Sequence, residues 1–278
     1  MVKHFIPSSL EEALDILNKE KVEIIAGGTD LMVQRRKWAN TVPAFEQTMN
    51  IINIPELSYI KAVNNKLHIG ATTSLTEIMN HKDTPELMKK AIYDIASPAL
   101  RNIATIAGNI GNASPAGDTL PILYVLNAKI VLVSPQATRT LPIEEVILGP
   151  RKTVIKKNEL IKEIILPIHD FTSTSFVKVG GRKADAISKV SFTGAVTIED
   201  NIILDIRIAF GAVGPVIVRS TKIENTIIEM SVQQLTESVT HIIEAYNDLI
   251  TPIDDQRSNK EYRKIVAKNL LKDFLLHL

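Results

Sequence analysis

The chain of 278 residues contains no cysteine, and only 5% of its residues are aromatic. The missing cysteine excludes disulfides, a catalytic thiolate, cysteine-ligated zinc and any cysteine-ligated iron–sulfur cluster within this chain. Trp38 is the sole tryptophan, so aromatic platforms that stack nucleic-acid bases are not indicated. An excess of one charge is also lacking, because 32 basic residues face 31 acidic ones. That balance argues against a nucleic-acid-binding protein.

Long apolar runs are missing too. No uninterrupted apolar stretch of about 20 residues occurs, so the sequence predicts no membrane span. The N-terminal residues carry no apolar signal core with a cleavage site, which predicts a cytoplasmic protein. The GxSxG, HExxH and P-loop motifs are absent, and none of the six histidines pairs with another at metal-ligand spacing. We therefore predict no metal site and assign no side chain as acid, base or nucleophile.

Periodic apolar residues are present, and they predict most of the helices. Two capping boxes, Ser9 with Glu12 and Ser74 with Glu77, mark helix starts. A short helix is expected to begin at Leu31. Longer helices are expected over 9–19, 85–96, 233–249 and 258–276, and a helix followed by a strand over 119–133. Residues 104–118 are rich in small residues and are expected to form an ordered loop.

Alternating and β-branched segments predict the strands. A hairpin is expected over 59–72, with Asn64 and Asn65 in its turn. Further strands are expected at 22–26, 159–166, 175–179, 189–199 and 202–213. The last three suggest an antiparallel meander followed by two helices. The chain is therefore expected to have an α+β fold with domains at 1–170 and 171–278.

Two glycine-bearing loops are the candidates for a binding site. The first, IIAGGTDL at 24–31, follows an expected strand and precedes an expected helix. Its paired glycines let backbone amides approach an anion closely, although GxGxxG is absent. The second, TIAGN at 105–109 continuing to SPAGD at 114–118, offers amides, hydroxyls and carboxamides. Taken singly, each loop can also be an ordinary structural connection.

Taken together, AGGTDL and, about 80 residues later, TIAGN followed by SPAGD resemble the FAD-binding medium subunit of the molybdenum hydroxylases. The resemblance extends to the opening FIPSSLEEALDIL and, near the other end, to DIRIAFGAVGPVIVRS. It implies a PCMH/vanillyl-alcohol-oxidase type of FAD-binding domain, made of two subdomains that clasp the cofactor. A C-terminal α+β domain with an antiparallel sheet and helices would follow.

The resemblance also assigns cofactor-binding positions residue by residue. The first pyrophosphate loop matches Ile24, Ile25, Ala26, Gly27, Gly28, Thr29, Asp30 and Leu31. The second loop matches Thr105, Ile106, Ala107, Gly108 and Asn109. Asp118 and Ser114 match positions near the polar chain of the flavin, and Ile161 and Lys178 match contacts to the isoalloxazine. These loops carry no lysine or arginine, so backbone amides and hydroxyls would have to hold the diphosphate.

The implied function is an FAD-binding electron-transfer subunit. It would pass electrons from the [2Fe–2S] clusters of a small partner subunit through FAD to an external acceptor. A large partner subunit would carry molybdopterin, and the assembly would be a dimer of heterotrimers. The missing cysteines agree with this role, because iron–sulfur clusters need cysteine and must then lie on other subunits. The substrate and the electron acceptor stay open.

Two other hypotheses stay open as well. A self-standing flavin-dependent oxidoreductase of the same fold would need its own acid or base beside the flavin. A scaffold that has lost FAD is suggested only by Ala107, where most members of the family have glycine. The methyl group is tolerable at negative φ and would hinder binding at positive φ. The basic run at 34–37 either meets an acidic partner or is a solvated face.

Overall fold

The structure, a computed structural model, describes residues 2–36, 42, 44–183 and 185–278, so Lys37 and Trp38 lie outside the described residues. The chain divides into two compact units that each combine separate stretches of sequence. The first unit comprises Met1–Thr84, Ala96–Ala113 and Asn127–Pro167. The second comprises Pro85–Ile95, Ser114–Leu126 and Ile168–Leu278. Two internal stretches therefore pack with the C-terminal part of the chain.

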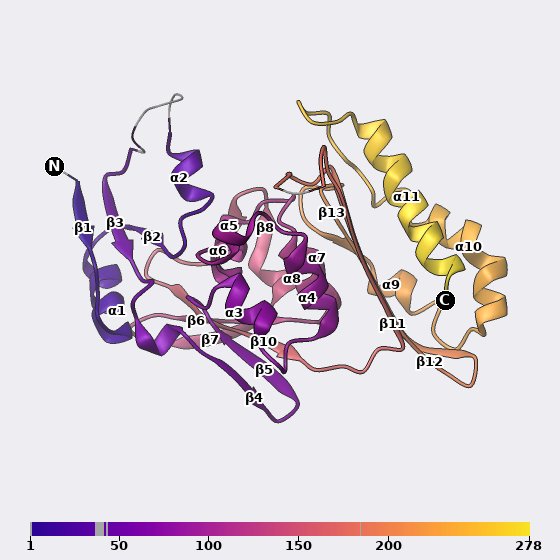
Figure 1. Cartoon of the computed structure of the whole chain (residues 1–278), viewed down its shortest axis with the longest axis horizontal. Coiled ribbons are helices and arrows are strands. Elements are labelled where there is room, and N and C mark those ends of the chain that lie inside the picture. The colour runs from indigo at the N-terminus through magenta and orange to yellow at the C-terminus, as the bar shows by residue number, and fades with distance from the viewer. Residues whose placement is uncertain (1, 37–41, 43, 184) are drawn as a thin grey trace. The chain divides into compact units, whose positions relative to one another are not determined.

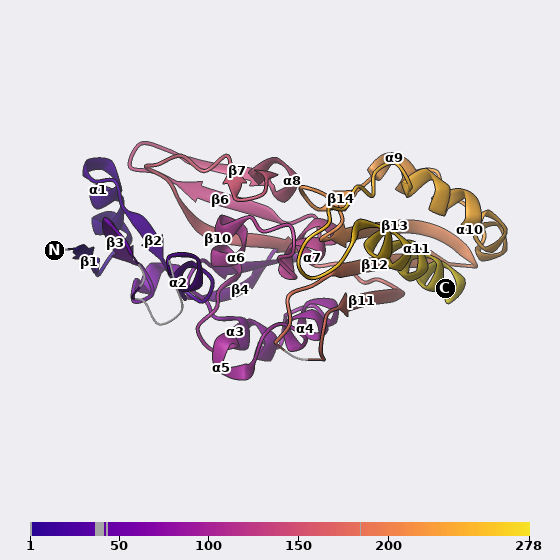
Figure 2. The same cartoon turned by 90° about the horizontal axis from the view of Figure 1, so that it is seen from above.

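The first unit begins with a small parallel sheet, of which the sequence predicts only the strand at 22–26. Its strands are β1 (Lys3–Phe5), β3 (Gln47–Asn50) and β2 (Glu23–Ile25), in the order β1-β3-β2. Helix α1 (Leu10–Lys19) lies beside this sheet (Figure 2). It buries Ala13 and Leu17 in a core that includes Met49. The Ser9 hydroxyl caps α1, but Glu12 accepts from Ser8 instead of completing the predicted box.

A five-stranded antiparallel sheet forms the rest of the first unit's β-structure. Its order is β4 (Ile60–Val63), β5 (Lys66–Gly70), β10 (Leu160–Pro167), β6 (Lys129–Val133) and β7 (Thr138–Pro142). The predicted hairpin at β4 and β5 is present. Asn64 and Asn65 turn it with φ values of 50° and 57°, the left-handed conformation that asparagine tolerates.

Short helices and a two-stranded ribbon complete the first unit. They are α2 (Leu31–Gln34), η1 (Pro55–Leu57), α3 (Leu75–Asn80), α5 (Pro98–Arg101), α6 (Ile106–Asn112), α8 (Ile143–Val146), β8 (Ile147–Gly149) and β9 (Lys152–Thr153). The capping box of α3 is complete, as predicted. The expectation that 104–118 is a loop was wrong, because the segment contains α6 and the start of α7 (Thr119–Val125) follows directly.

The buried carboxyl of Glu159 fixes the start of β10. Burial would raise its pKa, but Arg139, at 2.8 and 2.9 Å, and the amide of Lys156 hold the pKa below its ordinary value. A carboxyl with a lowered folded-state pKa stabilises the fold above its unfolded pKa, and that stability is lost as the pH falls through the folded value. We expect Glu159→Gln to destabilise the protein by about 1.5–3 kcal/mol at pH 7.

Urea unfolding of the wild type and of Glu159→Gln between pH 3 and pH 7 checks this prediction. The difference in unfolding free energy between the two proteins should shrink as the pH falls below about 4.5, the ordinary pKa of a glutamate. A difference that stays constant over that range would contradict it.

The second unit is built on a four-stranded antiparallel sheet. Its order is β11 (Ser173–Val179), β12 (Val190–Glu199), β13 (Ile202–Gly211) and β14 (Val218–Arg219). The sheet confirms the predicted meander, with Asp200 and Asn201 turning β12 into β13 at positive φ. Figure 1 shows α10 (Val232–Tyr246) and α11 (Lys260–Leu276) side by side near β12 and β13.

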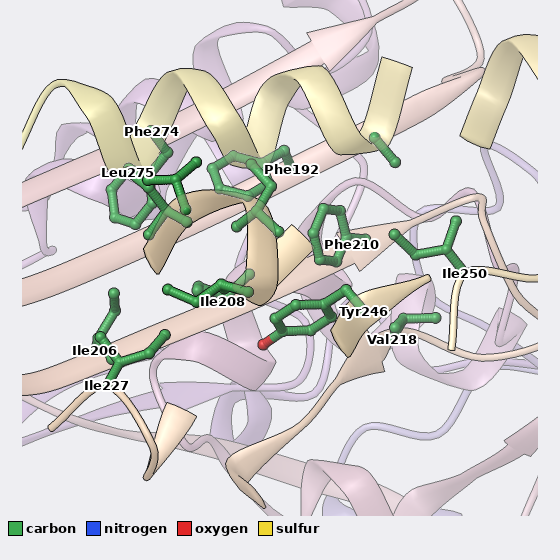
Figure 3. Packing of buried hydrophobic residues seen from close by; sticks show 14 of the residues in the cluster. Phe192, Ile206, Ile208, Phe210, Val218, Ile227, Tyr246, Ile250, Phe274 and Leu275 are labelled. Carbon is green, nitrogen blue, oxygen red and sulfur yellow. The ribbon is translucent and has the colours of Figure 1, made fainter. Parts of the chain in front are cut away.

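Helices cover both faces of this sheet. Phe192, Ile208 and Phe210 point to one face, where they meet residues of α10 and α11 (Figure 3). The rings of Phe192 and Phe274 have centroids 5.5 Å apart, and those of Phe210 and Tyr246 are also 5.5 Å apart. The opposite face packs on α7, and α4 (Glu86–Tyr93) lies against β11. Short α9 (Thr221–Glu224) follows β14.

Two arginines of this sheet hold the C-terminal end of α7. Arg207 donates to the carbonyl of Val125 at 3.0 Å, and Arg219 donates to the carbonyl of Tyr124. These carbonyls belong to the last turn of the helix, where the backbone offers few donors. Arg219 also forms a buried ion pair with Glu224, whose carboxylate accepts from the amide of Ile208 at 2.8 Å. The contacts explain why residues 114–126 belong to the second unit.

Candidate functional site

The first loop turns sharply after β2. Gly28 has a φ of +66°, a conformation that glycine adopts without strain, and its carbonyl accepts from the amide of Met32 at 3.0 Å. Asp30 is the residue before α2, as the predicted helix start at Leu31 requires. Helix α2 is a single turn of four residues that follows the loop directly.

Gly27 brings the first loop against the residues that precede the second. A Cβ atom at Gly27 would overlap the carbonyl oxygen of Ile103 and lie 2.6 Å from the carbonyl carbon. The Cα of Ala104 would be only 3.1 Å away. Two backbones approach this closely only where no side chain intervenes. Residues 24–31 and 105–109 both belong to the first unit, and the structure brings them together there, whereas the continuation at 114–118 belongs to the second unit.

The second loop is the N-terminal end of α6. Thr105 caps the helix by accepting from the amide of Gly108 at 3.0 Å. Ala107 is buried within the first turn and does not have a positive φ, so its methyl group does not strain the loop. Alanine at position 107 therefore no longer supports the hypothesis of a scaffold that has lost FAD.

One side of α6 is open. Gly108 and Gly111 are exposed, and a Cβ added at Gly111 would meet nothing within 4 Å. Ile106 and Ala107 are the first residues of the helix, so no intrahelical carbonyl accepts from their amides. Residues 105–112 contain no lysine or arginine. The loop can therefore bind an anionic, elongated molecule through backbone donors and small polar side chains, which fits the diphosphate of FAD.

Ile161 lies on β10, the strand that α6 packs against. Its side chain is buried, and the pairing of β10 with β6 shifts register between Ile161 and Glu163. An irregularity of this kind bends a strand and re-aims its side chains. Ile161 thus belongs to the same unit as both loops.

The structure brings Asp118 and Lys178 together in the second unit. Lys178 Nζ lies 2.8 Å from Asp118 Oδ2, and both side chains are 9% exposed. Ser188 donates to the other carboxylate oxygen, and Lys178 also donates to the carbonyl of Asp94 at 3.2 Å. Burial raises the pKa of the Asp118 carboxyl, and the hydrogen bonds and charge of Lys178 oppose that rise. Ser188 and Asp94 carry no sequence signal that could have singled them out.

Ser114 has a local role in the second unit. Its hydroxyl accepts from the amide of Ala116 at 3.3 Å, and its carbonyl accepts from the amide of Gly117 at 2.9 Å. The residue thereby shapes the turn that leads to Asp118. Its side chain is half-buried.

Two kinds of feature are missing from the described part of the chain. No group of three or more histidine, aspartate or glutamate side chains is placed to hold a metal ion there. None of the helices described combines the length and the apolar character needed to cross a membrane.

Known proteins share the fold. Residues 1–169 match the family described as "FAD binding domain in molybdopterin dehydrogenase", and residues 175–278 match the "CO dehydrogenase flavoprotein C-terminal domain". The nicotinate dehydrogenase FAD-subunit of Eubacterium barkeri is 34% identical over 207 residues, which cover 70% of this chain and 69% of the relative. The glyceraldehyde dehydrogenase medium chain of Sulfolobus acidocaldarius is 32% identical over 267 residues, covering 94% and 92%.

A solved structure of carbon monoxide dehydrogenase from Hydrogenophaga pseudoflava superposes on 98% of this chain and 95% of its own, with a TM-score of 0.89 and 25% identity. The fold thus defines a flavoprotein of the α+β class. Within that class, the chain belongs to the family of FAD-binding subunits of the molybdenum hydroxylases. The predicted family and fold class are confirmed.

Proposed function

We propose that this chain carries electrons through FAD from the [2Fe–2S] clusters of a partner subunit to an external acceptor. The observation that carries the proposal is the junction of the two loops, where Gly27 lies against Ile103 and leaves one side of α6 open. FAD supplies the electron chemistry when it is bound, and this chain binds and orients it. The absence of a predicted acid, base or nucleophile fits a subunit that transfers electrons without converting a substrate.

The cofactor contacts are proposed for the residues assigned above. Residues 24–31 and 105–109 would hold the pyrophosphate through their amides and hydroxyls. Ser114 and Asp118 would lie near the polar chain, and Ile161 and Lys178 near the isoalloxazine. In the same proposal, residues 1–170 form the FAD-binding domain and residues 171–278 form the C-terminal domain.

The partners are proposed from the family. The relatives named "FAD-subunit" and "medium chain" are by name parts of larger enzymes, which supports a multi-subunit assembly. We propose a large molybdopterin subunit, a small [2Fe–2S] subunit, a dimer of heterotrimers and a cytoplasmic location. Iron–sulfur clusters must lie outside a chain without cysteine.

Reconstitution tests this function. The purified chain, incubated with FAD and desalted, should retain about one flavin that absorbs near 450 nm, as bound oxidised flavin does. When the flavin-loaded chain is mixed with a large molybdopterin subunit and a small [2Fe–2S] subunit of its complex, the flavin should be reduced only when the substrate of the large subunit is present. A chain that retains no flavin would refute the proposal. Turnover of a small substrate by the isolated chain would favour the self-standing oxidoreductase instead.

A further inference from the structure

A side-chain bridge links the helix after the first loop to the helix of the second. Gln34, the last residue of α2, donates from Nε2 to the carboxylate of Asp30. The same amide donates to Oδ1 of Asn112, at 2.6 Å, and Asn112 is the last residue of α6. Residues separated by 78 positions in the sequence are joined by one carboxamide.

The bridge complements the backbone contact at Gly27. Gly27 meets Ile103 before α6 begins, whereas Gln34 meets Asn112 where α6 ends. The two loops are therefore held at two separate points, which fixes both their separation and their relative rotation. A single point would leave the open side of α6 free to turn away from the first loop.

A neighbouring ion pair shows by contrast what is special about Gln34. Arg35 pairs with Glu23 on β2, with one N–O distance of 2.9 Å. That pair ties α2 back to the strand that immediately precedes its own loop. It does not reach the second loop. The Gln34 amide, by contrast, crosses from α2 to α6.

We propose that Gln34 is a positioning residue for FAD, which sets the spacing of the two loops through Asp30 and Asn112. The proposal rests on the proposed function, because it assumes that both loops hold the cofactor. The carboxamide is well suited to the role, since its NH₂ group offers two donors to two oxygen acceptors. Two loops that are already held in the geometry needed for binding lose less conformational entropy when the cofactor binds. Preorganisation of the loops therefore strengthens the affinity for FAD.

The experiment measures FAD affinity in a double-mutant cycle of the full chain. Gln34→Ala and Asn112→Ala should each raise the dissociation constant of FAD by about 3- to 10-fold, the size expected for one hydrogen bond. The double variant should be no weaker than either single variant, because both changes remove the same link. The dissociation rate should account for the change, while the unfolding temperature of the flavin-free protein stays within about 2 °C of wild type.

Gln233→Ala is the matched control. Gln233 is also an exposed glutamine that donates to a carboxylate four residues away, that of Glu237 at 3.1 Å, but it lies on α10. It should leave FAD affinity unchanged. Wild-type affinity for FAD in Gln34→Ala, or additive effects in the double variant, would overturn this inference and leave the proposed function standing. A wild-type chain that binds no FAD would overturn the proposed function and this inference with it.

Discussion

Gly27→Ala is expected to weaken FAD binding by about 10- to 100-fold. The added methyl group would overlap the carbonyl of Ile103, so the backbones of the two loops would have to separate. The carbonyl carbon and oxygen of Ile103 are backbone atoms, so no flexible side chain can move aside. Overpacking of this kind typically costs about 1–3 kcal/mol of free energy. Because the same junction positions both loops, we expect the loss to appear in the dissociation constant of FAD, measured by the quenching of flavin fluorescence.

Gly181→Ala is the matched control for that variant. Like Gly27, Gly181 is one member of a Gly-Gly pair, but it is exposed and a Cβ there would meet nothing within 4 Å. It has no positive φ, so alanine introduces no backbone strain. Equal FAD affinity in Gly27→Ala and Gly181→Ala would show that the close approach of the two loops does not control binding.

Arg219→Ala is expected to destabilise the second unit by about 3–5 kcal/mol, the usual cost of removing one partner of a buried ion pair. Arg219 and Glu224 have side chains that are 8% and 4% exposed, with an N–O distance of 3.0 Å. The substitution leaves the Glu224 carboxylate buried without its cation. It also removes the Arg219 donor from the carbonyl of Tyr124 at the end of α7.

Urea unfolding of the complete chain, followed by circular dichroism, measures the loss. Arg182→Ala is the comparison, because Arg182 is 69% exposed and lies 3.6 Å from Asp185, so its ion pair should contribute less than about 1 kcal/mol. A loss below about 1 kcal/mol for Arg219→Ala would mean that the buried pair and the helix-end contact contribute little to stability.

Local signals in the sequence predicted much of the fold. Asn64–Asn65 and Asp200–Asn201 marked two hairpin turns, because asparagine and aspartate tolerate the left-handed conformation found there. The capping residues Ser9 and Ser74 marked helix starts correctly. Each signal acts over a few residues, so tertiary packing did not have to be known.

Helix α6 was missed because its composition argues against a helix. Gly108 and Gly111 each cost about 1 kcal/mol relative to alanine in a helix interior. The cap at Thr105 and the burial of Ile106 and Ile110 offset that cost in the folded chain. Intrinsic propensity was overridden by packing, which a single sequence does not reveal.

The sequence predicted which motifs would form the candidate site. It did not predict how their residues lie relative to one another. The resemblance selected Asp118 and Lys178, and the structure pairs them, but nothing in the sequence indicates that the chain between them returns Lys178 to that carboxylate. Ser188, which completes the cluster, is not among the positions that the resemblance assigns. The contact of Gly27 with Ile103 likewise depends on the fold of the whole first unit.

The second unit is assembled from three separate stretches, and this has a consequence for biosynthesis. Helices α4 and α7 leave the ribosome well before the strands β11 to β13 that they pack against. Synthesis proceeds at about 5–20 residues per second, so the apolar surface of α7 waits several seconds for its sheet. A nascent chain that stops near residue 170 would expose Leu120, Leu123 and Val125, which are buried in the complete protein. Folding of the second unit is therefore finished only after its strands and the helices α10 and α11 have been made.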